Sequence, residues 1–164
     1  MSQHQVRSYD YVNSAYARVR EALLADPSGI FRDATRSASA RARSLAAELH
    51  VKIAGVDVAT EIVVATGQMT EEPGGFYGMP VTRLPVSWEA AHHPELFPKM
   101  KGVLSICPLT PSETELEFFG QYEPPLGAVG DAFNDLVGHR VAEAAVHRLV
   151  ADIARHLHNR FSES

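Results

Sequence analysis

Hydrophobic and polar residues along this chain change their spacing once, close to His50. Before that point apolar residues recur at helical spacing, so residues 15–25 and 30–50 are each predicted to form a helix. Breaker residues at 26–29 separate the two helices. Residues 5–12, which are rich in tyrosine and valine, precede them and are predicted to form a strand.

After residue 50, apolar and polar residues alternate. This period of two is typical of antiparallel strands that have one buried face and one face in water. The predicted strands include residues 57–64, residues 83–90, a segment containing Leu104 and Ile106, and residues 113–122. Two connections are also predicted: residues 71–78 as a flexible, glycine-rich loop and residues 108–112 as a tight hairpin turn.

The last predicted element is a long helix that begins near Val129 and has no glycine or proline from His139 to about Phe161. At 1.5 Å per residue, some 30 residues span roughly 45 Å, which is comparable with the width of a small domain. Its apolar stripe is predicted to contain Phe133, Leu136, Val137, Val146, Leu149, Val150, Ile153 and Leu157, with Asp152 off the stripe. Such a helix can bury this stripe in the hollow of a curved antiparallel sheet.

The order of these elements resembles the helix-grip fold of the START-like (SRPBCC) superfamily, in particular its polyketide cyclase and lipid-transport branch. Residues 9–14 and 19–23 look like the family's opening strand and first helix. Residues 85–90 look like a central strand, and residues 116–127 like the last strand and its turn into the long helix. These are patterns of fold rather than of chemistry, and they cover nearly the whole chain.

The resemblance implies an α+β class in which a curved antiparallel sheet wraps around the long C-terminal helix, with two shorter helices after the first strand. It also implies one domain over residues 1–164. The expected function is binding of a small hydrophobic ligand, lipid-like or polyketide-like, between the sheet and the long helix. Two alternatives stay open: a cyclase or dehydratase acting on a polyketide-like substrate, and a non-catalytic interaction module whose core is filled by side chains.

The residues expected to line such a cavity share the apolar parity of their strands or of the helix stripe. They are Trp88, Leu104, Ile106, Leu116, Phe118, Tyr122, Phe133 and Val137. Tyr122 and Trp88 would add polar handles through O–H and N–H groups, although each residue is equally consistent with ordinary core packing. Asp10 would be a buried carboxylate if its strand face points inward, whereas the opposite parity would bury Tyr9 and Tyr11.

No catalytic residue can be assigned from the sequence, and no metal or cofactor is expected. His139, Glu143 and His147 share one side of the long helix, but the two histidines are about 12 Å apart along its axis, too far to bind one ion. His92 follows a strand and more often faces water than acts as a base. The chain has no Gly-x-Ser-x-Gly elbow and no Walker or Rossmann phosphate loop.

Composition narrows the class of partner. The chain has 164 residues, of which 45% are hydrophobic and 21% charged, and its formal net charge of −5 argues against nucleic acid as a partner. Residues 50–128 contain the whole of the acidic excess, and a row of glutamates at 113, 115 and 117 predicts an acidic outer sheet face. The partner that the resemblance implies remains a small hydrophobic ligand.

Cellular location and assembly are predicted only in outline. No run of about 18 apolar residues occurs and the N-terminal segment lacks a signal-peptide pattern, so neither membrane insertion nor export is expected. The single cysteine, Cys107, is interpreted as a small buried hydrophobe in a reducing, cytoplasmic environment. The oligomeric state is open, and a homodimer is possible.

Overall fold

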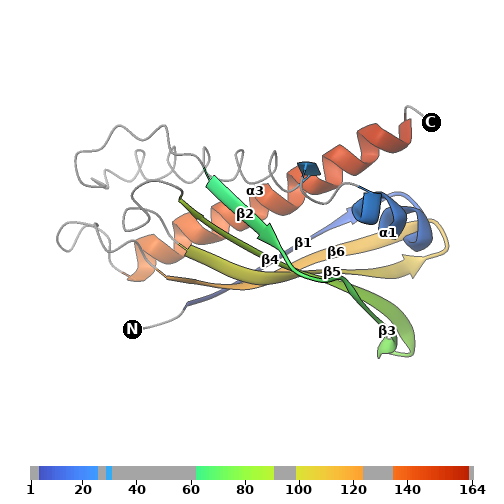
Figure 1. Ribbon diagram of the computed structural model, residues 1–164, viewed down its shortest axis with the longest axis horizontal. Coiled ribbons are helices and arrows are strands. Elements are labelled where there is room, and N and C mark those ends of the chain that lie inside the picture. The colour runs from blue at the N-terminus through green and yellow to red at the C-terminus, as the bar shows by residue number, and fades with distance from the viewer. Residues whose placement is uncertain (1–3, 26–28, 31–61, 91–98, 124–134, 163–164) are drawn as a thin grey trace.

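The computed structural model describes residues 4–25, 29–30, 62–90, 99–123 and 135–162 (Figure 1). Its elements, in chain order, are β1 (His4–Val12), α1 (Tyr16–Ala25), β2 (Ile62–Thr66), β3 (Thr70–Phe76), β4 (Met79–Ala90), β5 (Lys99–Thr110), β6 (Glu113–Glu123) and α3 (Asp135–Ser162). The predicted helix at 30–50 falls almost entirely outside the described residues, as do the first five residues of the strand predicted at 57–64.

The six strands form one antiparallel sheet in the order β1-β6-β5-β4-β2, with β3 also paired to β4. Helix α3 lies along one face of this curved sheet and packs against β1 and β6, while α1 covers the end where β5 and β6 meet their hairpin (Figure 1). This is the helix-grip arrangement. The α+β class and the curved antiparallel sheet on a long C-terminal helix are therefore confirmed.

Each strand has one face toward α3, here called the inner face, and one outer face. The register places Leu84, Leu104, Phe118 and Ser8 in a row across β4, β5, β6 and β1 on the inner face. All four residues are buried. Because side chains alternate along a strand, this row fixes which residues of every other row also face the helix.

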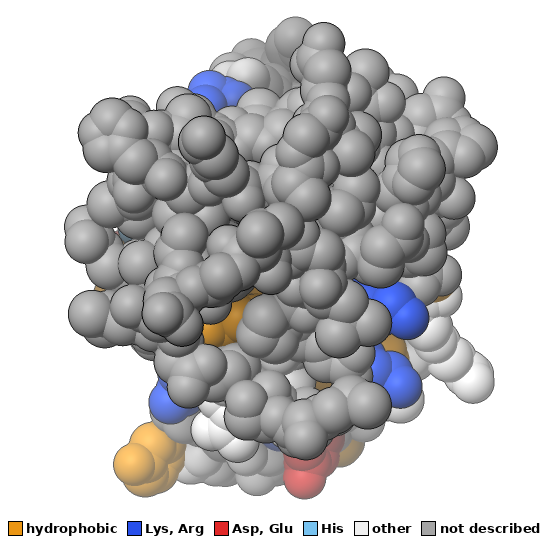
Figure 2. Space-filling model, turned by 90° about the vertical axis from the view of Figure 1, so that its left-hand side faces the viewer, with side chains coloured by type: hydrophobic (Ala, Val, Ile, Leu, Met, Phe, Trp, Pro, Cys, Tyr) orange, Lys and Arg blue, Asp and Glu red, His pale blue; other side chains and the backbone are white. Residues whose placement is uncertain are grey.

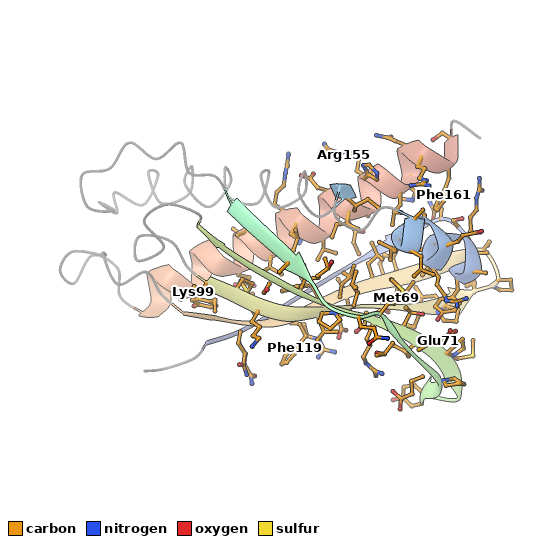
Figure 3. All side chains as sticks on the ribbon, viewed as in Figure 1. Met69, Glu71, Lys99, Phe119, Arg155 and Phe161 are labelled. Atoms are coloured by element: carbon orange, nitrogen blue, oxygen red, sulfur yellow. The ribbon has the colours of Figure 1, made fainter. Side chains whose placement is uncertain are left out.

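The apolar stripe of α3 is confirmed over its C-terminal half, where Val146, Leu149, Val150, Ile153 and Leu157 are fully buried. The stripe packs on the sheet together with the buried side chains of α1. Near its end, Phe161 lies beside α1, where the Arg18 guanidinium sits 4.5 Å from the centre of the phenyl ring (Figure 3).

One prediction about α3 is wrong. Asp152 was expected to lie off the buried apolar stripe, but its side chain is only 10% exposed. Arg155 Nη2 donates to Asp152 Oδ1 over 2.8 Å, and Arg148 Nε lies 3.5 Å from the same oxygen. Two guanidinium groups, three and four residues away on the helix, compensate the carboxylate at the margin of the core.

The prediction of a flexible loop over residues 71–78 is also wrong. Residues up to Phe76 form β3, which pairs with β4, and the register shifts between Glu72 and Phe76 around the Pro-Gly-Gly segment. Tyr77 and Gly78 form the turn with φ values of 49° and 78°. Among the described strands, β3 pairs only with β4. The missing N–H of its proline is therefore tolerated, because no second strand on the other side of β3 needs it as a hydrogen-bond donor. The hairpin at 108–112 is confirmed, with the turn at Pro111 and Ser112.

Candidate functional site

The inner face brings together five of the eight residues predicted to line a cavity. Leu104 and Ile106 on β5 are in register with Phe118 and Leu116 on β6, and Tyr122 follows on the same face of β6. All five side chains are between 0% and 2% exposed and belong to one core cluster with the stripe of α3. The structure therefore places them between sheet and helix, in contact with other side chains.

The side chains of the other three predicted residues lie outside the part of the chain that the structure describes. Trp88 is in β4, in register with Met100 and Val64, but only its backbone lies within the described part of the chain. Val137 is in the first turn of α3, and again only its backbone is described. Phe133 lies outside the described residues. His92 lies outside them as well.

Phe118 is positioned by two glycines that face each other across β5 and β6. A Cβ atom on Gly102 would lie 2.5 Å from Phe118 Cζ, and one on Gly120 would lie 2.7 Å from Phe118 Cε1. The phenyl ring therefore covers the bare backbone of both strands. The next row toward the end of the sheet contains Tyr122 and Met100, so the glycine row separates these two from the Phe118 row.

Polar groups at the edge of the inner face are satisfied within the protein. The Tyr16 hydroxyl of α1 is hydrogen-bonded to Thr82 Oγ1 on β4, and Thr114 Oγ1 on β6 donates to the Ser14 carbonyl over 2.8 Å. Sequence reasoning missed both pairs, because hydroxyl residues at strand and helix ends carry no periodic signal. They attach the start of α1 to β4 and β6 and close this end of the core.

Ser8 and His147 meet between β1 and α3, with Ser8 Oγ 3.4 Å from His147 Nδ1. This distance is longer than the 2.6–3.2 Å expected between a nucleophile and its base. Within the described ranges no group of three or more His, Cys, Asp or Glu residues is arranged to hold a metal ion.

The parity of β1, left open by the sequence, is decided by its pairing with β6. Val6, Ser8 and Val12 are buried on the inner face, whereas Tyr9 and Tyr11 point outward. Asp10 has the inner parity but is only partly buried, and its Oδ1 accepts a hydrogen bond from the Tyr11 backbone N–H over 2.8 Å. The carboxylate caps the backbone of an edge strand and is not enclosed in the core.

The outer face carries Glu115 and Glu117 of the predicted acidic row, together with the arginines Arg7 and Arg83. Arg7 Nη2 lies 2.9 Å from Glu117 Oε2, and the half-exposed Phe119 points away from α3 beside this pair (Figure 3). Cys107 is buried as predicted, but on this face and not in the core cluster. Burial, then the neighbouring Glu115 and Glu117 carboxylates, raise the pKa of the Cys107 thiol.

In chemical terms, the described inner face offers an apolar surface with few polar groups. One end is closed by α1 and the C-terminal half of α3. Figure 2 views the opposite end of the molecule, where hydrophobic side chains of described residues are visible near the centre. None of the described helices is both long enough and apolar enough to cross a membrane.

Comparison with known proteins gives a likeness of fold and no family assignment. No family model and no curated protein matches the chain. Among solved structures, a protein of Thermus thermophilus is 14% identical over 98% of this chain and 100% of its own, with a TM-score of 0.49. The Zhui aromatase/cyclase of a Streptomyces species is 15% identical over 98% of this chain and 96% of its own, with a TM-score of 0.45. A conserved protein of Geobacillus kaustophilus is 14% identical over 91% and 94%, with a TM-score of 0.42.

Proposed function

We propose that this protein binds a small hydrophobic molecule, lipid-like or polyketide-like, between the inner face of the sheet and α3. The observation that carries the proposal is the continuous apolar surface formed by β4, β5, β6 and α3. A soluble ligand with little polarity gains most of its binding free energy from contact with such a surface.

The ligand belongs at the Tyr122 end of the inner face. At the other end, β5 and β6 are contacted by α1, so the inner face there is covered by this helix as well as by α3. Tyr122 and Met100 lie beyond the glycine row, toward the N-terminal end of α3. Of the described residues, these two are the best placed to touch a bound molecule.

The alternative is a core that is filled by side chains and holds no ligand. The burial of the described inner-face residues in one cluster is the observation that favours this alternative. Two measurements separate the hypotheses. Native mass spectrometry of the purified protein detects a co-purified molecule, and titration with the apolar fluorophore 1-aminoanthracene measures uptake. The binding hypothesis predicts saturable uptake with one probe per chain. A filled core predicts none, and that result together with the absence of a bound molecule would overturn the proposal.

Two variants locate the uptake. Met100→Phe enlarges a side chain at the Tyr122 end and is expected to weaken 1-aminoanthracene binding at least about tenfold, because the ring occupies ligand space. Ile106→Val at the packed end is the control, expected to lower stability by about 0.5–1.5 kcal/mol with unchanged affinity. Equal affinities in both variants would contradict the assigned position, and urea unfolding confirms that both proteins are folded.

A further inference from the structure

A hollow of ≈ 850 Å³ lies on the outer face of the sheet, on the side opposite α3. Its floor is β5, whose outward residues Val103, Ser105 and Cys107 are all small or short. Side chains of the neighbouring strands, most of them larger, flank it on both sides. They are Arg7, Tyr9 and Tyr11 on β1, Glu115, Glu117 and Phe119 on β6, and Val81 and Arg83 on β4. The hollow therefore follows from the sizes of neighbouring residues on one sheet face.

The strand register gives the hollow its internal order. One row runs from Tyr9 through Glu117 and Ser105 to Arg83, and the next runs from Tyr11 through Glu115 and Cys107. The two tyrosine rings meet edge to face, with centroids 6.1 Å apart and an interplanar angle of 73°. Both remain largely in solvent, at 59% and 44% exposed, so they form an accessible wall.

Two arginines and two glutamates line the hollow, but they are not all paired with one another. Arg7 forms an ion pair with Glu117, and Arg83 forms one with Glu72 of β3. In the part of the chain that the structure describes, Glu115 forms no ion pair. Burial and the adjacent Glu117 carboxylate raise the pKa of Glu115, while Arg7 acts in the opposite direction. The Glu115 carboxylate, which has no ion-pair partner among the described residues, thus lies beside the floor of the hollow and in register with Tyr11 of the aromatic wall.

We propose that this outer hollow binds a small organic ammonium ion with an aromatic or aliphatic body. The cation would pair with Glu115, and its body would lie against the Tyr9 and Tyr11 rings. Aromatic faces attract cations, and a carboxylate without a partner supplies the charge that such a ligand complements. The volume is within the range of small-molecule sites. This site is separate from the inner face and does not depend on the function proposed for it.

The test uses three probes that differ at one position: tyramine, 4-ethylphenol and 4-hydroxyphenylacetate. Each is titrated into the full-length, isotope-labelled protein and followed by ¹H–¹⁵N NMR at pH 7. The proposal predicts that tyramine shifts the backbone signals of Tyr11, Cys107 and Glu115. It further predicts binding at least tenfold weaker for the neutral probe and none for the anion. Equal binding of tyramine and 4-ethylphenol would overturn it.

Glu115→Gln removes the charge and keeps the shape, and is expected to weaken tyramine binding about tenfold. Glu113→Gln changes the same strand outside the lining of the hollow and is expected to stay within twofold of the unmodified protein. The NMR spectra establish that both variants fold. If Glu115→Gln binds tyramine as tightly as Glu113→Gln does, the proposal is wrong.

Two further outcomes are informative. Sedimentation at NMR concentration shows whether a second copy covers the outer face, and a dimer that fails to bind tyramine would contradict the proposed ligand class. Tyramine at saturation is expected to leave 1-aminoanthracene uptake unchanged. Failure of the inner-face function would therefore show as lost uptake of the fluorophore, and failure of this site as lost binding of tyramine.

Discussion

In the described core, the Phe118 ring packs directly on the backbone of two glycines, Gly102 and Gly120. The Phe118 ring occupies the space where side chains would rise from Gly102 and Gly120. A Cβ on Gly102 would also lie 2.7 Å from the Phe119 carbonyl oxygen, which is backbone and cannot rotate away. Glycine at this position is therefore required by the contact between strand and ring, whatever the protein binds.

Gly102→Ala is accordingly expected to lower the free energy of unfolding by about 1–3 kcal/mol, in the range of overpacked core substitutions. Gly74→Ala is the matched control, because nothing lies within 4 Å of a Cβ built there. Its effect should stay within about 0.5 kcal/mol. Urea unfolding of the three proteins gives the comparison, and equal losses in the two variants would mean that the core can give way around Phe118.

At the scale of elements, the β3–β4 hairpin depends on a turn whose two residues both have positive φ. Glycine tolerates this conformation, and the turn is of the kind in which Asn-Gly is strongly preferred. Tyr77 has a φ of 49°, a left-handed conformation that strains the backbone of a residue with a Cβ atom. Its side chain is 92% exposed, so packing of the ring offsets little of this strain. The turn carries avoidable strain at its first position.

Tyr77→Asn is therefore expected to raise the free energy of unfolding by about 0.5–1 kcal/mol. Gly78→Ala, at a φ of 78°, should lower it by about 1 kcal/mol. Chemical denaturation measures both changes. A loss of stability in Tyr77→Asn would show that contacts of the tyrosine ring outweigh the strain of its backbone.

Periodicity predicts an element well when one of its faces is strongly apolar. The alternation over 113–122 and the stripe from Val146 to Leu157 each meet this condition, and both elements were predicted correctly. β3 was missed because its Pro-Gly-Gly sequence resembles a loop, and only pairing with β4 makes it a strand. Local sequence does not contain that pairing.

The sequence predicts the site only to the extent that it predicts which face of a strand each residue lies on. Leu104, Ile106 and Phe118 were correctly placed on one face, because alternation along β5 and β6 is clear. The parity of β1 was ambiguous, since the aromatic rings of Tyr9 and Tyr11 can be buried in a core as the valines of the opposite face can. The outer hollow could not be foreseen, because it arises from residue sizes on four strands brought into register.

At the scale of the whole molecule, stability should depend on pH through Glu115. The pKa of Glu115 is higher in the folded protein than its ordinary value, first because of burial and then because of Glu117. Its contribution to stability is therefore complete below the unfolded-state pKa and is lost as the pH rises through the folded-state pKa. The folded protein is penalised at neutral pH for ionising this carboxyl group.

Glu115→Gln removes that penalty, so the variant should be more stable than the unmodified protein at pH 7, by a margin that narrows toward pH 3. Thermal unfolding at several pH values measures the margin, with Glu113→Gln as the control on the same strand. A margin that is constant with pH would exclude Glu115 as its source. If a carboxylate serves binding rather than folding, its replacement by a neutral residue is expected to stabilise the protein.

The pairing of β1 with β6 has a consequence for how the chain folds during synthesis. His4 pairs with Tyr122 and Val12 with Thr114, so the first strand meets its neighbour only after more than a hundred residues have been made. During translation β1 has no strand to pair with until β6 has left the ribosome. Such long-range closure slows folding, since chain entropy is lost before these contacts form. The Tyr- and Val-rich β1 strand therefore waits for its β6 partner while the intervening residues are made, a period in which an unpaired strand is prone to aggregate.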